Sequence, residues 1–135
     1  MDTTEAYIKM CEKADEIQSI AEIPTHDSGF FWCKAHDILM DYCDGGYLFC
    51  KMASCRSDKY TWLPRQDQLQ NMVIFPDHPY YQIGRFNVTI DEWCDKNYLA
   101  SGASMEQLWL AFVMKELYNK VWVTEREEWV KVTAN

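Results

Sequence analysis

The stretch SMEQLWLAFVMKELYN, residues 104–119, is the segment that decides the fold. Ser104 and Gln107 have the spacing of a capping box, which predicts a helix from Met105 to about Asn119. Its apolar residues include Leu108, Trp109, Ala111, Phe112, Val113, Leu117 and Tyr118. Because they cover most of the circumference, we expect a central, buried helix rather than a surface helix.

A second helix is predicted at the start of the chain, over Thr4–Ile20. Asp2 or Thr3 is expected to cap it, and Glu5 stands in capping-box register with Asp2. One stripe of this helix is apolar at three- and four-residue intervals, through Tyr7, Met10, Cys11, Ala14 and Ile17. Such a stripe must pack against another part of the protein, because a single amphipathic helix is not stable alone.

Two further helices are predicted between these segments. One is expected over Pro64–Val73, because proline suits the first helical turn, where an amide has no partner. The other is expected to begin at the capping box Thr89–Glu92 and to continue to about Tyr98.

Short β-prone runs are expected to form strands over Phe30–Cys33, Ile38–Cys43, Tyr47–Met52, Tyr60–Trp62, Tyr80–Ile83, Val121–Val123 and Trp129–Val132. Asp44–Gly46 predicts a hairpin turn between the second and third runs, because glycine readily adopts a positive φ. A short helix over Ala35–Tyr42 is the competing interpretation of this hairpin, and an extended clasp about Thr124–Glu127 is the competing interpretation of the last two runs. Together these elements predict an α+β fold, a small antiparallel sheet packed by about four helices in one compact domain, residues 1–135.

The chain is acidic, with 21 Asp and Glu against 13 Lys and Arg and a formal net charge of −8. An acidic surface repels phosphate backbones, so direct nucleic-acid binding is not expected. The same surface suits docking onto a basic groove of another protein. No signal peptide or membrane-spanning run is recognised, so a cytoplasmic protein with six reduced cysteines is expected.

Four residues between positions 33 and 55 could bind a metal ion, namely Cys33, His36, Cys50 and Cys55. Only Cys33 and His36 form a close pair, whereas structural zinc sites usually combine two close pairs. Buried cysteines that pack as small apolar residues explain the same pattern. We expect no bound metal and no cofactor. The chain also lacks a nucleophile elbow and a phosphate-binding glycine loop, so an enzyme is not expected.

Two groups of residues are candidates for binding a ligand or a partner. Arg65, Gln66 and Asp67 follow Trp62, and forked hydrogen bonds beside an indole wall could recognise a planar or anionic group. A solvated helix face beside a buried Trp62 explains the same residues. Trp122 and Trp129, near the acidic end of the chain, are expected to be less buried and to form a partner surface.

Four segments resemble a group of small proteins encoded by phages and prophages of gut bacteria. They are EAYIKMCEKADEIQ (5–18), WLPRQDQLQ (62–70), SMEQLWLAFVMKELYNKVW (104–122) and EEWV (127–130), while the cysteine-rich region 24–59 departs from the group. The resemblance implies a phage accessory protein in the bacterial cytoplasm and supplies no catalytic residue.

These observations lead to the expectation of a non-enzymatic protein that acts by binding, as an inhibitor of a host or anti-phage defence protein. The alternatives are a binder of a small ligand or nucleotide signal at Trp62, Arg65 and Gln66, a packaging or structural component, and a zinc-binding phage protein.

Overall fold

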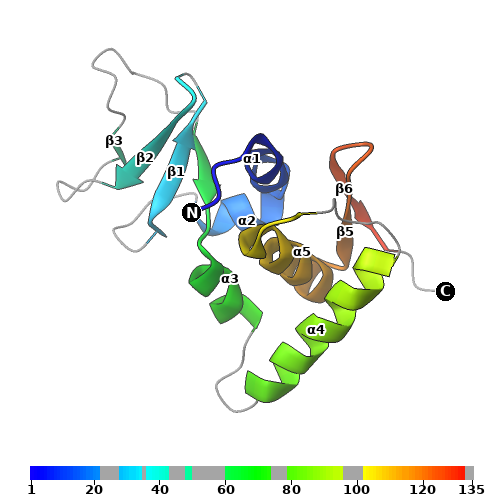
Figure 1. The fold of residues 1–135 in the computed structure, drawn as a ribbon. Helices are drawn as coiled ribbons and strands as arrows, with labels where there is room; N and C mark the ends of the chain where they lie inside the picture. The colour runs from blue at the N-terminus through cyan, green and yellow to red at the C-terminus, as the bar shows by residue number, and fades with distance from the viewer. Residues whose placement is uncertain are drawn as a thin grey trace. The chain divides into compact units, whose positions relative to one another are not determined.

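The computed structural model describes residues 1–21, 28–34, 36–42, 48–49, 60–73, 79–95 and 102–132. These residues form five helices and two antiparallel sheets, so the α+β prediction is confirmed (Figure 1). The chain divides into two compact units, residues 1–65 and 66–135, with Asp2 belonging to the second. The prediction of one domain over 1–135 stays a prediction.

The first unit contains an antiparallel sheet in the strand order β3-β2-β1-β4. Its strands are β1 (Phe30–Cys33), β2 (Ile38–Tyr42), β3 (Leu48–Phe49) and β4 (Tyr60–Leu63). The hairpin of β2 and β3 is confirmed, with Asp41 opposite Phe49, while its predicted turn at 44–46 lies outside the described residues. The alternative of a helix over 35–42 is wrong, because residues 38–41 of β2 pair with β1 in an antiparallel ladder.

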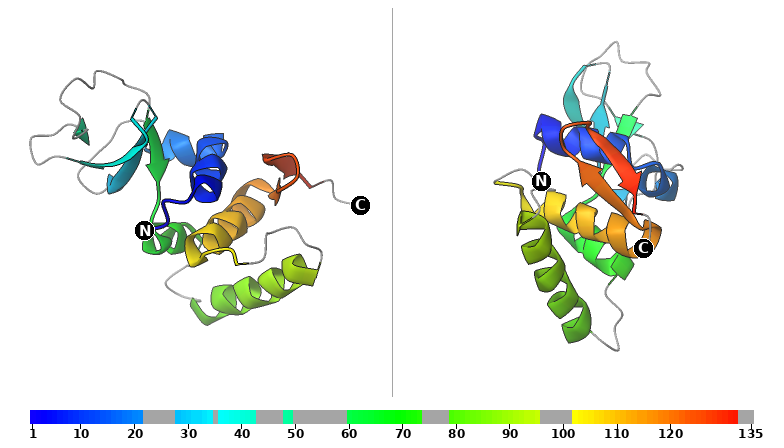
Figure 2. Two further views of the ribbon diagram at one scale, coloured as in Figure 1. Left: turned by 45° about the horizontal axis from the view of Figure 1, so that its top comes forward. Right: turned by 90° about the vertical axis from the view of Figure 1, so that its right-hand side faces the viewer.

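The predicted first helix is divided into α1 (Glu5–Glu12) and α2 (Asp15–Ile20), with α1 beside β4 (Figure 2). The apolar stripe from Tyr7 to Ile17 is buried as expected. The helix breaks where the Cys11 carbonyl accepts hydrogen bonds from the Ala14 amide (3.1 Å) and the Gln18 side chain (2.9 Å). The cap is Thr4, whose hydroxyl accepts from the Tyr7 amide, so the prediction of Asp2 or Thr3 is wrong.

The second unit is built around α5 (Met105–Tyr118), which contacts α3 (Gln66–Val73), α4 (Pro79–Asp95) and β5 (Lys120–Val123) (Figure 1). The last strand of the unit, β6 (Glu128–Lys131), pairs with β5. Residues 109–114 of α5 are each at most 3% exposed, so the predicted buried helix is confirmed. Its end differs from the prediction, because Leu117 is 46% exposed.

The capping box of α5 is confirmed, because the Ser104 hydroxyl accepts from the Gln107 amide at 3.2 Å. Asp2 reaches the same place: its Oδ2 accepts from the Ser104 hydroxyl (2.5 Å) and from the Gln107 side-chain amide (2.8 Å). Asn119 ends the helix in the left-handed conformation, with φ 55°. The predicted terminal strands are confirmed as the β5–β6 hairpin.

Helix α4 overturns two predictions. A strand over 80–83 and a helix beginning at Thr89 were expected, but one helix runs through both. The reason is tertiary: Phe86 and Trp93 lie seven residues apart on one face and are buried, and the Phe86 ring stacks on Trp109 at 4.0 Å. Helix α3 begins at Gln66, two residues later than predicted.

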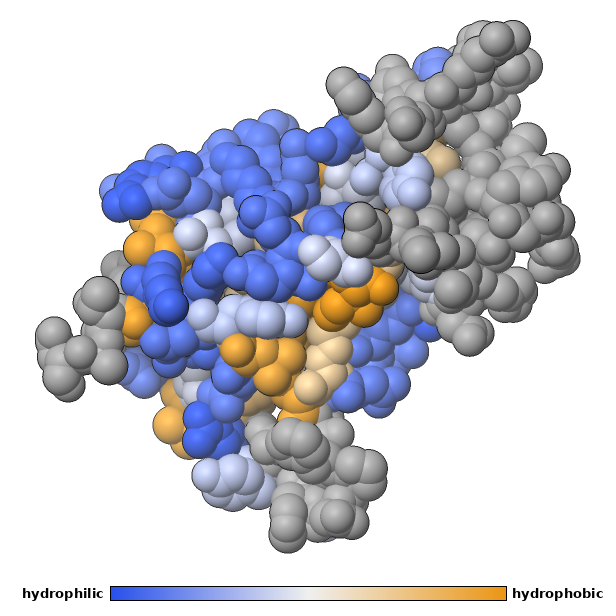
Figure 3. All heavy atoms as spheres, turned by 180° about the vertical axis from the view of Figure 1, so that it is seen from behind, coloured by the Kyte–Doolittle hydropathy of each residue, from blue (hydrophilic) through white to orange (hydrophobic). Residues whose placement is uncertain are grey.

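On the face seen from behind, hydrophilic side chains dominate and apolar ones form separate patches (Figure 3). None of the helices in the described ranges combines the length and the hydrophobicity that a membrane crossing requires.

Candidate functional site

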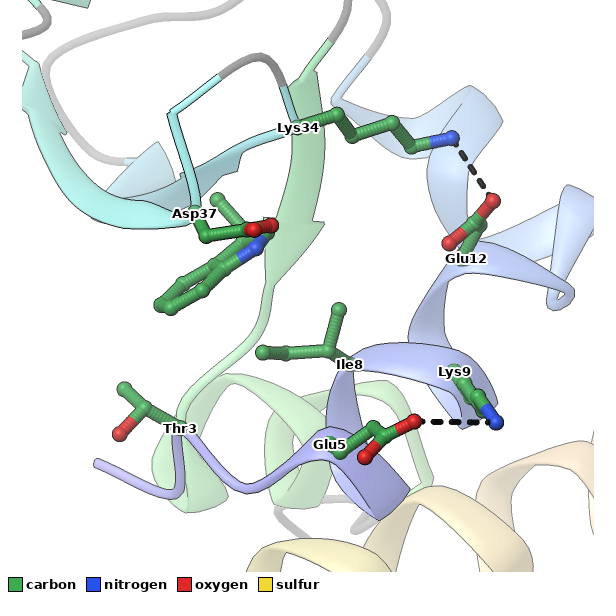
Figure 4. A pocket seen from close by; sticks show the side chains of 8 residues that line it. Thr3, Glu5, Ile8, Lys9, Glu12, Lys34 and Asp37 are labelled. Carbon is green, nitrogen blue, oxygen red and sulfur yellow. Dashed lines mark hydrogen bonds and ion pairs between the residues drawn. The ribbon is translucent and has the colours of Figure 1, made fainter.

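A groove in the first unit lies between α1 and the loop that joins β1 to β2 (Figure 4). It has a volume of about 570 Å³, within the range typical of ligand-binding clefts. We call it the Trp32 groove; it is lined by Thr3, Glu5, Ile8, Lys9, Glu12, Trp32, Lys34 and Asp37.

Helical and strand periodicity together build this groove. Glu5, Ile8 and Glu12 follow each other at three- and four-residue spacing, so they share one face of α1. Trp32 lies on β1 between the buried residues Phe31 and Cys33, and alternation along a strand turns its indole to the opposite side of the sheet. The indole is partly exposed, whereas the side chains of Phe31 and Cys33 are buried in the core.

Two ion pairs border the groove on the side of α1. Lys34 Nζ lies 2.8 Å from Glu12 Oε1, and Lys9 Nζ lies 3.2 Å from Glu5 Oε1. All four side chains are at least 36% exposed, so each pair contributes up to about 1 kcal/mol to stability. These pairs offset the charges of two of the acids that line the groove.

Asp37 contributes the third carboxylate and stands apart from both ion pairs (Figure 4). It is the last residue before β2 and has φ 52°, a conformation that Asp and Asn tolerate better than most residues. Its backbone amide donates to the Cys33 carbonyl at 2.8 Å. Within the described part of the chain, no ion pair or hydrogen bond engages its carboxylate, so the groove retains one uncompensated negative charge.

An indole beside an uncompensated carboxylate is suited to a cation. Lysine and arginine side chains bind over tryptophan faces with about 0.5–2 kcal/mol. A guanidinium group can also make forked hydrogen bonds to a carboxylate, which an ammonium group cannot. The groove therefore has the chemistry to receive a basic side chain, with Ile8 and Trp32 as apolar walls and Asp37 as the counter-ion.

Trp62, expected as a stacking wall, does not provide an open one. It is 4% exposed, and its Nε1 donates to the Ser28 carbonyl at 2.7 Å, so its indole belongs to the core. Arg65 ends the first unit, and Gln66 and Asp67 begin the second in the first turn of α3. A ligand site at these residues stays a prediction.

Trp122 and Trp129 are opposite each other in the β5–β6 hairpin, with ring centroids 5.2 Å apart. The expectation that Trp122 is less buried is wrong, because it is 6% exposed. Trp129 is partly exposed, and a partner surface at Trp122 and Trp129 stays a prediction.

Cys33 and His36 are neighbours in space, with Cys33 Sγ 3.7 Å from His36 Nδ1. Among the described residues, no three His, Cys, Asp or Glu side chains come together in a way that could hold a metal ion. Cys50 and Cys55 lie outside those residues, so the zinc alternative stays a prediction.

Sequence reasoning singled out neither Asp37 nor Trp32 as a site residue. The signal that could have found Trp32 is the alternation in FFWC, since a core position for Phe31 and Cys33 excludes one for Trp32. Comparisons of the chain with protein-family models, with curated proteins and with solved structures found no significant match, so the resemblance to phage proteins stays a prediction.

Proposed function

We propose that this protein acts by binding, and that the Trp32 groove receives a basic segment of a partner protein. The observation that carries the proposal is the Asp37 carboxylate, which is exposed beside a partly exposed indole and has no counter-ion among the described residues. A partner would supply an arginine whose guanidinium lies on Trp32 and pairs with Asp37.

The charge of the whole chain supports the same partner. A net charge of −8 attracts basic surfaces over distances beyond direct contact and accelerates their association. In a bacterium infected by a phage, such a partner would be a host or defence protein with an exposed basic segment. Holding that segment in the Trp32 groove would inhibit the partner without any reaction being catalysed.

A direct test is fluorescence anisotropy with a labelled peptide that contains one arginine among neutral residues. Matched peptides with lysine or glutamine at that position define the chemistry. We expect the order arginine, lysine, glutamine in affinity, and weaker binding as salt is added, because exposed charges are screened. Equal affinity for all three peptides would contradict the proposal.

Two substitutions locate the binding site. Trp32→Leu keeps an apolar side chain but removes the indole, and should weaken binding about 2- to 30-fold, as expected for a loss of roughly 0.5–2 kcal/mol. Asp37→Asn should weaken it by up to about fivefold, the measured range for one exposed ion pair, and asparagine tolerates the same positive φ.

Glu127→Gln is the matched control for Asp37→Asn. Glu127 is also exposed, also precedes a strand and has φ 50°, but lies in the second unit. Both substitutions remove one negative charge, so general attraction to an acidic protein predicts equal effects. The proposal requires that Asp37→Asn weakens binding of the arginine peptide measurably more than Glu127→Gln does.

A further inference from the structure

Helix α4 carries exposed apolar side chains on its outward face. Phe86 and Trp93 point into the core, while Tyr80 is 89% and Val88 is 69% exposed. Gly84 lies midway between these two exposed residues at four-residue spacing, so the three residues form one ridge along the helix, which we call the α4 ridge. Tyr81, 62% exposed, flanks it.

The packing of the described residues does not require a glycine at position 84. A Cβ atom placed there would meet no atom within 4 Å, and its φ is not in the left-handed region. Glycine destabilises a helix interior relative to alanine. Gly84 therefore lowers the stability of α4, and no contact among the described residues explains its presence. Absence of a side chain is useful where another backbone approaches closely.

We propose that α4 packs against α4 of a second copy of this chain, antiparallel, with a twofold axis passing beside Gly84. In that arrangement Tyr80 of each copy lies against Val88 of the other, so the same patch serves both sides, as a twofold interface requires. Ridges with four-residue spacing interdigitate in the commonest class of helix packing. The missing side chain at the crossing point lets the two helices approach.

Charges on the helix are compatible with a second copy. The α4 ridge has no charged residue, and Arg85 beside it is engaged by Glu116 of α5 at 2.6 Å. Asp91, the next exposed acid, is seven residues from Gly84. At 1.5 Å per residue the two Asp91 side chains are about 20 Å apart, beyond the Debye length of about 10 Å. A basic partner would find no acid on the ridge itself.

The area available sets the strength of the contact. Two tyrosines exposed at 89% and 62% offer roughly 230–380 Å² per copy, from about 150–250 Å² for a whole aromatic side chain. For two copies the tyrosines offer roughly 460–760 Å², and with Val88 added the area stays below the lower limit of about 1,000 Å² for a stable specific interface. We therefore expect a weak dimer that dissociates on dilution.

Sedimentation equilibrium of the full chain over a wide range of concentration tests the proposal. We expect a monomer–dimer equilibrium that added salt strengthens, because each copy carries a net charge of −8. This salt dependence is opposite to that of peptide binding in the Trp32 groove, so failure of one proposal leaves the other intact. A chain that stays monomeric at every concentration and salt would overturn the dimer.

Two variants locate the interface. Val88→Glu should abolish dimerisation, whereas Ile83→Glu, which places the same charge on an exposed aliphatic position of α4 outside the ridge, should weaken it much less. Gly84→Ala separates folding from association. It should raise the melting temperature, because alanine favours a helix more than glycine does. It should also weaken the dimer roughly fivefold or more, because the added methyl group crowds the helix contact at the twofold axis. Dimerisation that is unaffected by Val88→Glu, or strengthened by Gly84→Ala, would overturn the interface.

Discussion

Gln18 protects the open edge of the first sheet, and its replacement should destabilise the protein strongly. β4 is an edge strand, and the backbone groups of Trp62 on its outer side are both bonded to the Gln18 side chain. The Trp62 amide donates to Gln18 Oε1 at 2.8 Å, and Gln18 Nε2 donates to the Trp62 carbonyl at 3.0 Å. The side chain thus takes the place of a neighbouring strand.

The size of this loss of stability can be estimated from the backbone groups that lose their hydrogen-bond partners. Gln18→Ala leaves the amide and the carbonyl of Trp62 without their side-chain partner, at a residue only 4% exposed. One buried unsatisfied group costs about 1–3 kcal/mol, so we expect a loss of about 2–4 kcal/mol in the free energy of unfolding. Urea denaturation followed by circular dichroism measures it.

Gln18→Glu tests the direction of the bonds. The variant side chain has nearly the same shape, but as a carboxylate it cannot donate to the carbonyls of Cys11 and Trp62. Those two oxygens, together with partial burial, should raise the pKa of the new carboxyl above its unfolded value of about 4.3.

The sign of the pH dependence follows from this raised pKa. The folded variant binds a proton more tightly than the unfolded variant, so its stability deficit is full above the folded-state pKa. The deficit shrinks as pH falls through that pKa, because the protonated carboxyl can donate again. Gln70→Glu, the same change at a partly exposed position of α3, is the control and should show no such recovery. A Gln18→Glu deficit that is independent of pH would refute the reasoning.

Two further predictions concern buried hydrogen bonds. Tyr7→Phe removes the hydroxyl that donates to the Pro64 carbonyl at 2.5 Å in a fully buried position, and should cost about 1–2 kcal/mol in thermal or urea denaturation, whereas no change would mean that the bond contributes nothing. Asp2→Ala removes the acceptor for Ser104 and Gln107 at the start of α5 and should cost about 1.5–3 kcal/mol; Asp2→Asn, which keeps one oxygen, should recover part of that loss.

Sequence patterns predicted an element correctly where the residues that determine it all lie within that element. The capping box at Ser104 and the continuous apolar surface after it predicted α5 to within one residue at its end, because both signals act within a few turns. The first and last strands of the described chain were predicted for the same reason, since short β-branched and aromatic runs bounded by turns have few alternatives.

Sequence patterns gave the wrong helix bounds where a contact with a residue far along the chain determines where a helix begins or breaks. The capping box at Thr89 has the correct spacing, but Phe86 stacks on Trp109 of α5 and draws the preceding residues into the same helix. Likewise the stripe from Tyr7 to Ile17 predicted one continuous helix, and the chain breaks because Gln18 reaches across to Trp62. In both cases a tertiary contact outweighs a preference worth about 1 kcal/mol or less.

The sequence by itself determined the fold class, the acidic charge, the central helix and the buried stripe of the first helix, because periodicity and composition are properties of neighbouring residues. Only the tertiary structure placed Asp37 and Trp32 beside Glu5, Ile8 and the rest of the α1 face. The physical reason is that a groove forms from two surfaces whose meeting depends on how strands and helices pack, and a carboxylate is recognised as uncompensated only once its surroundings are known.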